Sequence, residues 1–274
     1  MLRLLFTFAA TLFGALAAAF AHGDLHEAID AVSRVIAESP HDASLLVRRA
    51  ELFRMHRDWP AAEADYAQAR QLEPALEIVA FGLAQMRLAQ GREKDALKLL
   101  DDFLAKRPAH AGARVVRAGL LEKRGDWRKA DADLAAAVAS SPEPHLATAR
   151  AELLERHGQP DTAVRCLDAA SRAHGRVPVL EQQALAIEER AGRTAAALRR
   201  LDDLAAREPR PDIWLARKAQ LLEKAGRGPE ARAAWQQAAA AFERVPADRR
   251  ASKVNRTLAA EIAAGRGGAP AKEP

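Results

Sequence analysis

A period of about 34 residues runs through this sequence and constrains what the chain can fold into, because each copy must form one supersecondary unit. Four prolines share that spacing: Pro40, Pro74, Pro108 and Pro142. Glycines form a second series at the same interval or twice that interval, to within one position: Gly23, Gly91, Gly125, Gly158, Gly192 and Gly226. Within one period, residues 117–142, apolar side chains at helical spacing flank the turn and predict two short helices. A hairpin of this kind cannot bury its own apolar face, so its copies must stack on one another.

Two further series place small and large side chains at fixed points of the second helix. An alanine stands five residues after each turn marker, where two helices must approach closely and only a small side chain fits. The series is Ala28, Ala62, Ala96, Ala130, Ala163, Ala197 and Ala231. A larger residue follows four positions later in each copy: Val32, Tyr66, Leu100, Leu134, Leu167, Leu201 and Trp235.

These series resemble the tetratricopeptide repeat family, whose unit of about 34 residues has a small residue in its first helix, Gly at the turn and Ala early in its second helix. The small first-helix residue is present as Ala50, Ala84, Ala118, Ala151 and Ala219. Leu185 departs from the pattern in the fifth repeat, and Arg57 fills the missing glycine slot. The resemblance covers residues 23 to about 245 and implies an all-α fold, a right-handed α-solenoid of helix-turn-helix repeats with terminal caps.

The period divides the chain into an ordered set of segments. Residues 22–40 fit the turn and second helix of a half-repeat that acts as an N-terminal cap. Six full repeats follow at 43–76, 77–110, 111–143, 144–177, 178–211 and 212–245. An amphipathic capping helix is predicted over 247–264, and the Gly- and Pro-rich tail 265–274 is expected to be disordered.

Residues 1–21 differ in character from the repeats. They carry one charged residue, Arg3, an apolar run from Leu4, and small residues at Ala19 and Ala21. This pattern predicts a secretory signal peptide with His22 as the first residue of the mature chain, and hence a periplasmic or secreted protein that no longer contacts a membrane. An uncleaved membrane anchor is the alternative, because the apolar run is nearly long enough to span a bilayer.

Charge and cysteine content exclude other classes of protein. The net charge is +5, but acidic and basic residues interleave on every predicted helix. A nucleic-acid-binding protein would gather its basic residues on one stripe, so we expect no nucleic-acid partner. Cys166 is the single cysteine, cannot form an internal disulfide, and is interpreted as a small buried residue.

No motif for catalysis or for a cofactor is found. The sequence has no Gly-rich phosphate loop, no HExxH, no GxSxG and no paired-cysteine metal site. We therefore expect a protein that is not an enzyme and has no cofactor. The alternative is a metal site at the mature N-terminus: after cleavage, the free amine and imidazole of His22, with Asp24 or His26, could chelate a copper-like ion. The spacing of these residues matches no complete pattern of metal ligands. We therefore interpret them as polar residues of the first helical turn.

The resemblance also implies where a partner would bind. Family members hold a peptide or helix in a concave groove lined by the second, fifth, ninth and twelfth residues of each first helix. In the first three repeats these are Ser44, Val47, Glu51 and Arg54; Ile78, Phe81, Gln85 and Leu88; Gly112, Val115, Gly119 and Glu122. In the last three they are His145, Thr148, Glu152 and Glu155; Val179, Gln182, Ala186 and Glu189; Ile213, Ala216, Gln220 and Glu223.

The chemistry of these positions points to a class of partner. The family's carboxylate clamp needs Lys at the fifth and Asn at the ninth position, and neither is present. We expect Glu152, Glu155 and Glu189 to lie exposed and to attract a basic or amphipathic segment of another envelope protein. The sequence thus predicts an interaction scaffold or adaptor of the bacterial cell envelope. The alternatives are a metal-binding accessory protein that uses its N-terminal His, or a non-catalytic subunit of an exported enzyme complex.

Overall fold

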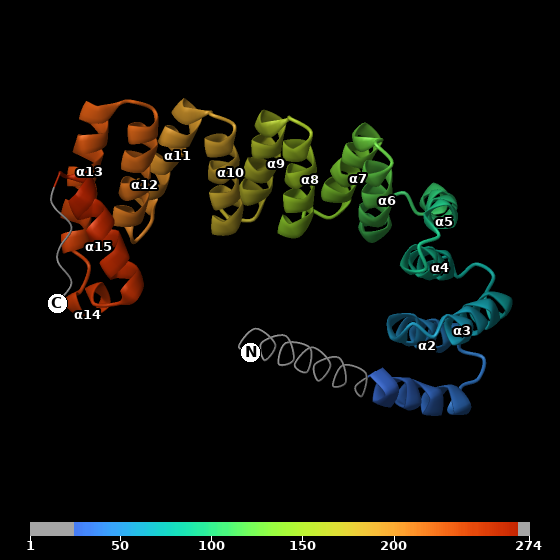
Figure 1. Ribbon diagram of the computed structural model, residues 1–274. Helices are drawn as coiled ribbons and strands as arrows, with labels where there is room; N and C mark the ends of the chain where they lie inside the picture. Colours follow the sequence, from blue (N-terminus) through green and yellow to red (C-terminus); the bar gives the residue numbers. More distant parts are fainter. Residues whose placement is uncertain (1–24, 268–274) are drawn as a thin grey trace, which may run out of the picture. The chain divides into compact units, whose positions relative to one another are not determined.

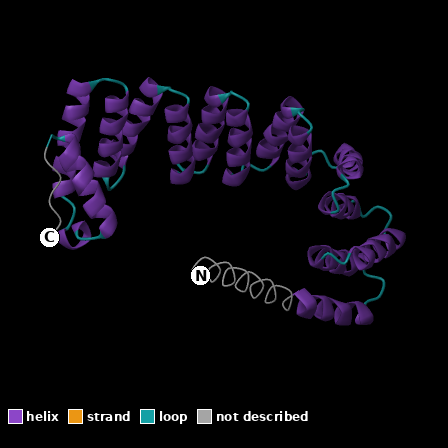
Figure 2. Ribbon diagram, in the orientation of Figure 1, coloured by secondary structure: helices purple, strands orange, loops and turns teal. Residues whose placement is uncertain are grey.

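The structure, a computed structural model, describes residues 25–267 and contains only helices and loops within that range (Figures 1 and 2). The chain forms two compact units, residues 1–141 and 142–274, which are described separately below. The all-α class and the helix-turn-helix arrangement predicted from the period are confirmed. The predicted signal peptide, His22 and the tail from residue 268 lie outside the described residues.

Unit 1 contains a helix over residues 25–38 and three hairpins. The hairpins are α2 (Ala43–His56) with α3 (Trp59–Leu72), α4 (Ile78–Ala89) with α5 (Glu93–Lys106), and α6 (Ala111–Lys123) with α7 (Trp127–Ser140). The first helix of each hairpin packs against the second helix of the same hairpin, and α4 and α6 also pack against the second helix of the preceding one. Each hairpin thus shares its core with the next, as stacking requires.

Unit 2 contains three hairpins and a C-terminal pair of helices. The hairpins are α8 (Pro144–Arg156) with α9 (Pro160–Ala173), α10 (Pro178–Arg190) with α11 (Thr194–Arg207), and α12 (Pro211–Lys224) with α13 (Gly228–Glu243). The final pair is α14 (Ala247–Arg250) and α15 (Lys253–Gly265). Helix α15 packs against α12 and α13 and covers the end of the stack.

The turns explain the glycine series. Within the described residues the glycines of the series adopt a positive φ, a conformation that glycine reaches without steric cost. They are Gly91 at +74°, Gly125 at +87°, Gly158, Gly192 and Gly226. Arg57 fills the missing slot at φ 64°, and its backbone N–H still bonds to the carbonyl oxygens of Arg54 and Phe53 at the end of α2. The turn therefore forms without glycine, although the left-handed backbone conformation of Arg57 costs free energy.

Six of the seven alanines of the series are buried as predicted, whereas Ala28 is half-buried. The six members from Ala62 to Ala231 are 0% or 1% exposed. Leu185, which replaces the small first-helix residue in the fifth repeat, is also 0% exposed and packs with Ala197 and Leu201 in the core of unit 2. The hairpin of α10 and α11 therefore accommodates a larger side chain at this contact.

Three expectations are corrected. The capping helix predicted over 247–264 is two helices, because Ser252 caps a new helix by accepting a hydrogen bond from the backbone N–H of Asn255. Gly265, assigned to the tail, is the last residue of α15, and a Cβ there would collide with the ring of Trp235. Cys166 is half-buried and not buried. No helix in the range 25–267 is both long and apolar enough to cross a membrane.

Candidate functional site

The candidate residues of unit 1 lie on the first helices α2, α4 and α6, and every one of them is half-buried. They are Val47, Glu51, Arg54, Phe81, Gln85, Val115 and Glu122. The first two helices meet closely, since a Cβ on Gly82 of α4 would lie 2.7 Å from Oε1 of Glu51 on α2. The structure thus brings the α2 and α4 positions together.

Glu51 is engaged by its own unit. The hydroxyl of Tyr66 on α3 donates a hydrogen bond to Oε1, and Arg54 donates from Nε and Nη2 to Oε2 at 2.9 and 2.7 Å. Burial first, and then the hydrogen bond to Glu51, raises the pKa of the Tyr66 hydroxyl. A carboxylate with these partners stabilises the α2–α3 hairpin and is poorly placed to recognise a basic ligand.

Phe81 of α4 belongs to an aromatic cluster with Phe103 of α5 and with His110, which precedes α6. Its ring centroid lies 5.6 Å from that of Phe103 and 4.9 Å from that of His110. Nδ1 of His110 accepts a hydrogen bond from the backbone N–H of Ala113 at 3.0 Å and so caps α6. The cavity beside Phe103 and His110 has a volume of about 170 Å³, below the roughly 300 Å³ at which small-molecule sites begin.

Two pairs of neighbouring helices in unit 2, α8 with α10 and α12 with α15, are joined by polar links. Thr148 of α8 bonds to Gln183 of α10 at 3.0 Å, and Gln220 of α12 bonds to Glu261 of α15 at 3.2 Å. Each link joins residues at similar distances from the start of their two helices.

Two arginines complete the series of links. Arg190 donates to both oxygens of Glu155 at 2.7 and 3.0 Å. Arg217 donates to both oxygens of Glu189 at 2.9 and 2.7 Å. These bidentate pairs fix α8, α10 and α12 to one another.

The carboxylates expected to attract a basic partner therefore differ in their availability. Glu155 and Glu189 are half-buried and neutralised by arginines, so the expectation that they are exposed is wrong. Glu223 is exposed, and one of its oxygens accepts a hydrogen bond from Nε1 of Trp235 at 2.8 Å. Glu152 is exposed and has no hydrogen bond or ion pair with any residue in the described part of the chain.

The first helices of unit 2 also expose apolar side chains. Val179 of α10 is 64% exposed and Ile213 of α12 is 41% exposed, one period apart. Gln182, one turn after Val179 on the same face of α10, is exposed as well. This surface, defined by Glu152, Val179, Gln182 and Ile213, is called the α8–α12 face below.

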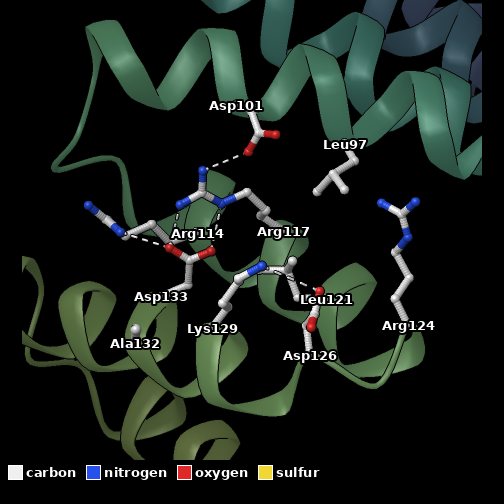
Figure 3. Close-up of a pocket in the computed structure, with 10 residues that line it drawn as sticks. All are labelled: Leu97, Asp101, Arg114, Arg117, Leu121, Arg124, Asp126, Lys129, Ala132 and Asp133. Carbon is white, nitrogen blue, oxygen red and sulfur yellow. Dashed lines mark hydrogen bonds and ion pairs between the residues drawn. The ribbon is translucent and has the colours of Figure 1, made fainter.

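A hollow in unit 1 contains polar residues that were not predicted from the sequence (Figure 3). It lies among α5, α6 and α7 and has a volume of about 500 Å³. Arg117 donates to both oxygens of Asp133 at 2.7 Å and to Asp101 at 2.8 Å, while Arg114 donates to Asp133 at 2.8 Å. Asp133 is 3% exposed, so these arginines satisfy a buried carboxylate.

The same contact recurs elsewhere. Arg49 donates to both oxygens of Asp65, again sixteen residues later. In the hairpin of α10 and α11 the charges are exchanged: Arg200 of the second helix donates to Glu188 and to Asp168. The Arg–Asp pairs could have been found in the sequence by their separation of sixteen residues. In the structure each of these pairs joins the two helices of one hairpin.

The remaining candidate residues, those proposed to bind a metal, do not gather into one site in the described part of the chain. Within residues 25–267 no group of three His, Cys, Asp or Glu side chains could hold a metal ion. His26 lies with its ring centroid 4.4 Å from that of His56, and its proposed partner His22 is outside the described residues. No buried polar side-chain atom within the described range lacks a hydrogen-bond partner.

Comparison with known proteins agrees with the repeat pattern. Residues 15–77 and 187–252 match the model of the tetratricopeptide repeat family. No curated protein matches the sequence significantly. Yeast Tom70 is similar in structure over 84% of this chain and 46% of its own, with 16% identity and a TM-score of 0.52, a likeness that shows the fold.

Two other solved structures are similar over more of their own length. YrrB, described as a repeat protein with an unusual peptide-binding site, is 18% identical over 69% of this chain and 98% of its own, with a TM-score of 0.48. A repeat protein from Parabacteroides merdae is 16% identical over 88% and 93% of the two chains, with a TM-score of 0.47.

Proposed function

Since the chain is a tetratricopeptide repeat protein, we propose that it is a non-catalytic scaffold of the bacterial cell envelope that binds a segment of a partner protein on the α8–α12 face. Proteins built from this repeat are generally non-catalytic scaffolds for protein–protein interaction. The observation that carries the proposal is the exposure of Val179 and Ile213 on first helices that Arg190 and Arg217 tie together.

The surroundings of these two residues favour an amphipathic partner. Val179 and Ile213 offer apolar contacts, and Glu152 is an exposed carboxylate without a counter-ion in the described part of the chain. A helix with an apolar stripe beside basic residues would satisfy both. The links between α8, α10 and α12 fix the face before binding, and a fixed surface lowers the entropic cost of association.

Photo-crosslinking from the face tests the proposal. A benzoylphenylalanine at Gln182 should crosslink to a protein of the cell envelope, whereas the same group at Arg199, exposed on the second helix α11, should not. Val179→Asp and Ile213→Asp should abolish the crosslink while leaving unfolding free energies within about 0.5 kcal/mol, because both side chains are exposed. A crosslink that persists in both variants, or that forms equally from Arg199, contradicts binding at this face.

We also propose that residues 1–21 direct export and are removed after Ala21. The proposal is supported by the composition of the segment alone. Amino-terminal sequencing of protein from a periplasmic extract should begin at His22. An intact Met1 in a membrane fraction would support the anchored alternative.

A further inference from the structure

Unit 1 has a second hollow one repeat before the hollow in Figure 3. It lies among α3, α4 and α5 and has a volume of about 460 Å³, close to the 500 Å³ of the other. Most of the positions that line the two hollows are separated by one period of 34 residues. Such pairs are Glu63 and Leu97, Arg87 and Leu121, and Leu99 and Asp133. The two are called the α3–α5 hollow and the α5–α7 hollow below.

Each hollow has two leucines among its lining residues. Leu83 and Leu99 line the α3–α5 hollow and are half-buried. The α5–α7 hollow has Leu97, which is half-buried, and Leu121, which is 8% exposed. Both volumes fall in the range of roughly 300–1,000 Å³ that is typical of ligand sites. Each hollow therefore has room and apolar surface for one apolar side chain of a ligand.

The α5–α7 hollow has an unpaired cation, Arg124. The other charged residues that line it are paired: Arg117 with Asp101, Arg114 with Asp133, and Lys129 with Asp126. Arg124 is exposed, and its side chain makes no hydrogen bond or ion pair with any residue in the range 25–267. Figure 3 shows it on the side of the hollow opposite to Asp133, with no dashed line to the other residues drawn.

The α3–α5 hollow has two unpaired cations, Arg70 and Lys98. Its paired residues are Arg87 with Glu63 and Arg92 with Asp95. Arg70, Lys98 and Asp102 are exposed, and their side chains have no partner in the part of the chain that the structure describes. The two hollows together thus leave three cations and one carboxylate unpaired, an excess of positive charge beside apolar surface.

We infer that these two hollows bind an acidic segment of a partner protein, which places an apolar residue in each hollow and carboxylates beside Arg70, Lys98 and Arg124. Charge complementarity identifies the occupant, because unpaired cations attract carboxylates. Repetition of the hollow along consecutive repeats favours an extended segment, since one chain can contact both hollows.

The lining residues favour a protein segment over a nucleic acid. Single-stranded nucleic acids bind by stacking their bases on aromatic side chains, and the described residues that line either hollow include no aromatic side chain. The inference goes beyond the proposed function. It concerns unit 1 and an acidic partner, whereas the α8–α12 face belongs to unit 2 and is proposed to bind a basic one.

Binding of a defined peptide tests the inference. The probe is a fluorescein-labelled peptide of Leu, Asp and Glu residues, and fluorescence anisotropy measures its Kd for the purified full chain. Lys98→Glu and Arg124→Glu should each raise the Kd at least about fivefold, because each reverses a charge at the contact. Asp102→Asn should lower the Kd, because it removes the unpaired carboxylate. These side chains are exposed and unpaired within residues 25–267, so the variants should fold normally.

A matched control lies on α5. Lys106 is exposed, lines neither hollow and makes no ion pair within the described residues. Lys106→Glu should therefore leave the Kd within about twofold, since salt screens charges that are not in contact. Glu152→Lys on the α8–α12 face should also leave it unchanged, so the two surfaces are tested independently.

Several results would overturn the inference. Lys106→Glu that weakens binding as much as Arg124→Glu would show a general attraction to a basic protein. Equal binding of a peptide in which Lys replaces every Asp and Glu, or no binding at low salt, would show that no acidic segment is recognised. Displacement of the peptide by inorganic phosphate or by a single-stranded oligonucleotide at constant ionic strength would assign the hollows to that anion instead.

Discussion

The hydroxyl of Tyr66 donates a hydrogen bond to the carboxylate of Glu51, across the hairpin of α2 and α3 and against Gly82 of α4. Tyr66 is 0% exposed and is the single tyrosine of the sequence. One contact thus joins three helices of unit 1 and can be followed by a signal from one residue.

Alkaline pH should destabilise unit 1 through Tyr66. Burial and Glu51 raise its pKa in the folded chain, while the unfolded chain ionises near the ordinary value of about 10. A group with a raised pKa binds its proton more tightly when folded, so stability falls as pH rises above about 10. Tyrosinate absorbance should appear only as the helices unfold, and its reversible appearance near pH 10 with helicity intact would contradict this.

Tyr66→Phe should cost about 1.5 kcal/mol at pH 7, since it removes a hydrogen bond to a charged acceptor. Urea unfolding measures the loss. The variant should also lose the part of the alkaline destabilisation that comes from this residue, so the difference from the natural chain should shrink above pH 10.

Two glycines of unit 1 should respond to alanine in opposite directions. A Cβ on Gly82 would lie 2.5 Å from the hydroxyl oxygen of Tyr66, so Gly82→Ala should cost about 1–3 kcal/mol by overpacking. A Cβ on Gly119 meets nothing within 4 Å, so Gly119→Ala should stabilise α6 by about 0.5–1 kcal/mol. Thermal unfolding of both variants decides the matter, and equal shifts would show that the contact with Tyr66 is unimportant.

The alanine series predicts a second matched comparison. Ala130 and Ala163 are 0% exposed where the two helices of a hairpin meet, so Ala130→Leu or Ala163→Leu should cost about 1–3 kcal/mol. Ala139→Leu, on the exposed side of α7, should change stability by less than about 0.5 kcal/mol. Chemical denaturation would contradict the assignment if all three variants were equally stable.

Charge reversals on the first helices of unit 2 should separate structural from available carboxylates. Glu152→Lys should leave stability within about 0.5 kcal/mol. Glu155→Lys should cost about 1 kcal/mol, because it places a cation beside Arg190 in a bidentate contact. The exchange Glu155→Arg with Arg190→Glu should recover most of the loss, and a double-mutant cycle without coupling would show that the pair contributes nothing.

The sequence by itself determined the hairpins and their contacts. Helix periodicity, turn glycines and the small residues from Ala62 to Ala231 act within one repeat or between adjacent ones, where chain geometry leaves little freedom. The position of the turn at Arg57 followed from the period alone, although its residue type did not indicate a turn.

Only the tertiary structure decided which carboxylates of the first helices remain available to bind a partner. Glu155 and Glu189 are equivalent in register to Glu122 and Glu223, so position in the repeat could not separate them. Glu155 and Glu189 are paired with Arg190 and Arg217, which are long side chains from neighbouring helices. Whether these arginines reach the carboxylates is set by the packing of the helices. Register is a local property of the chain, whereas the pairing of charges depends on distances between helices that the one-dimensional pattern does not contain.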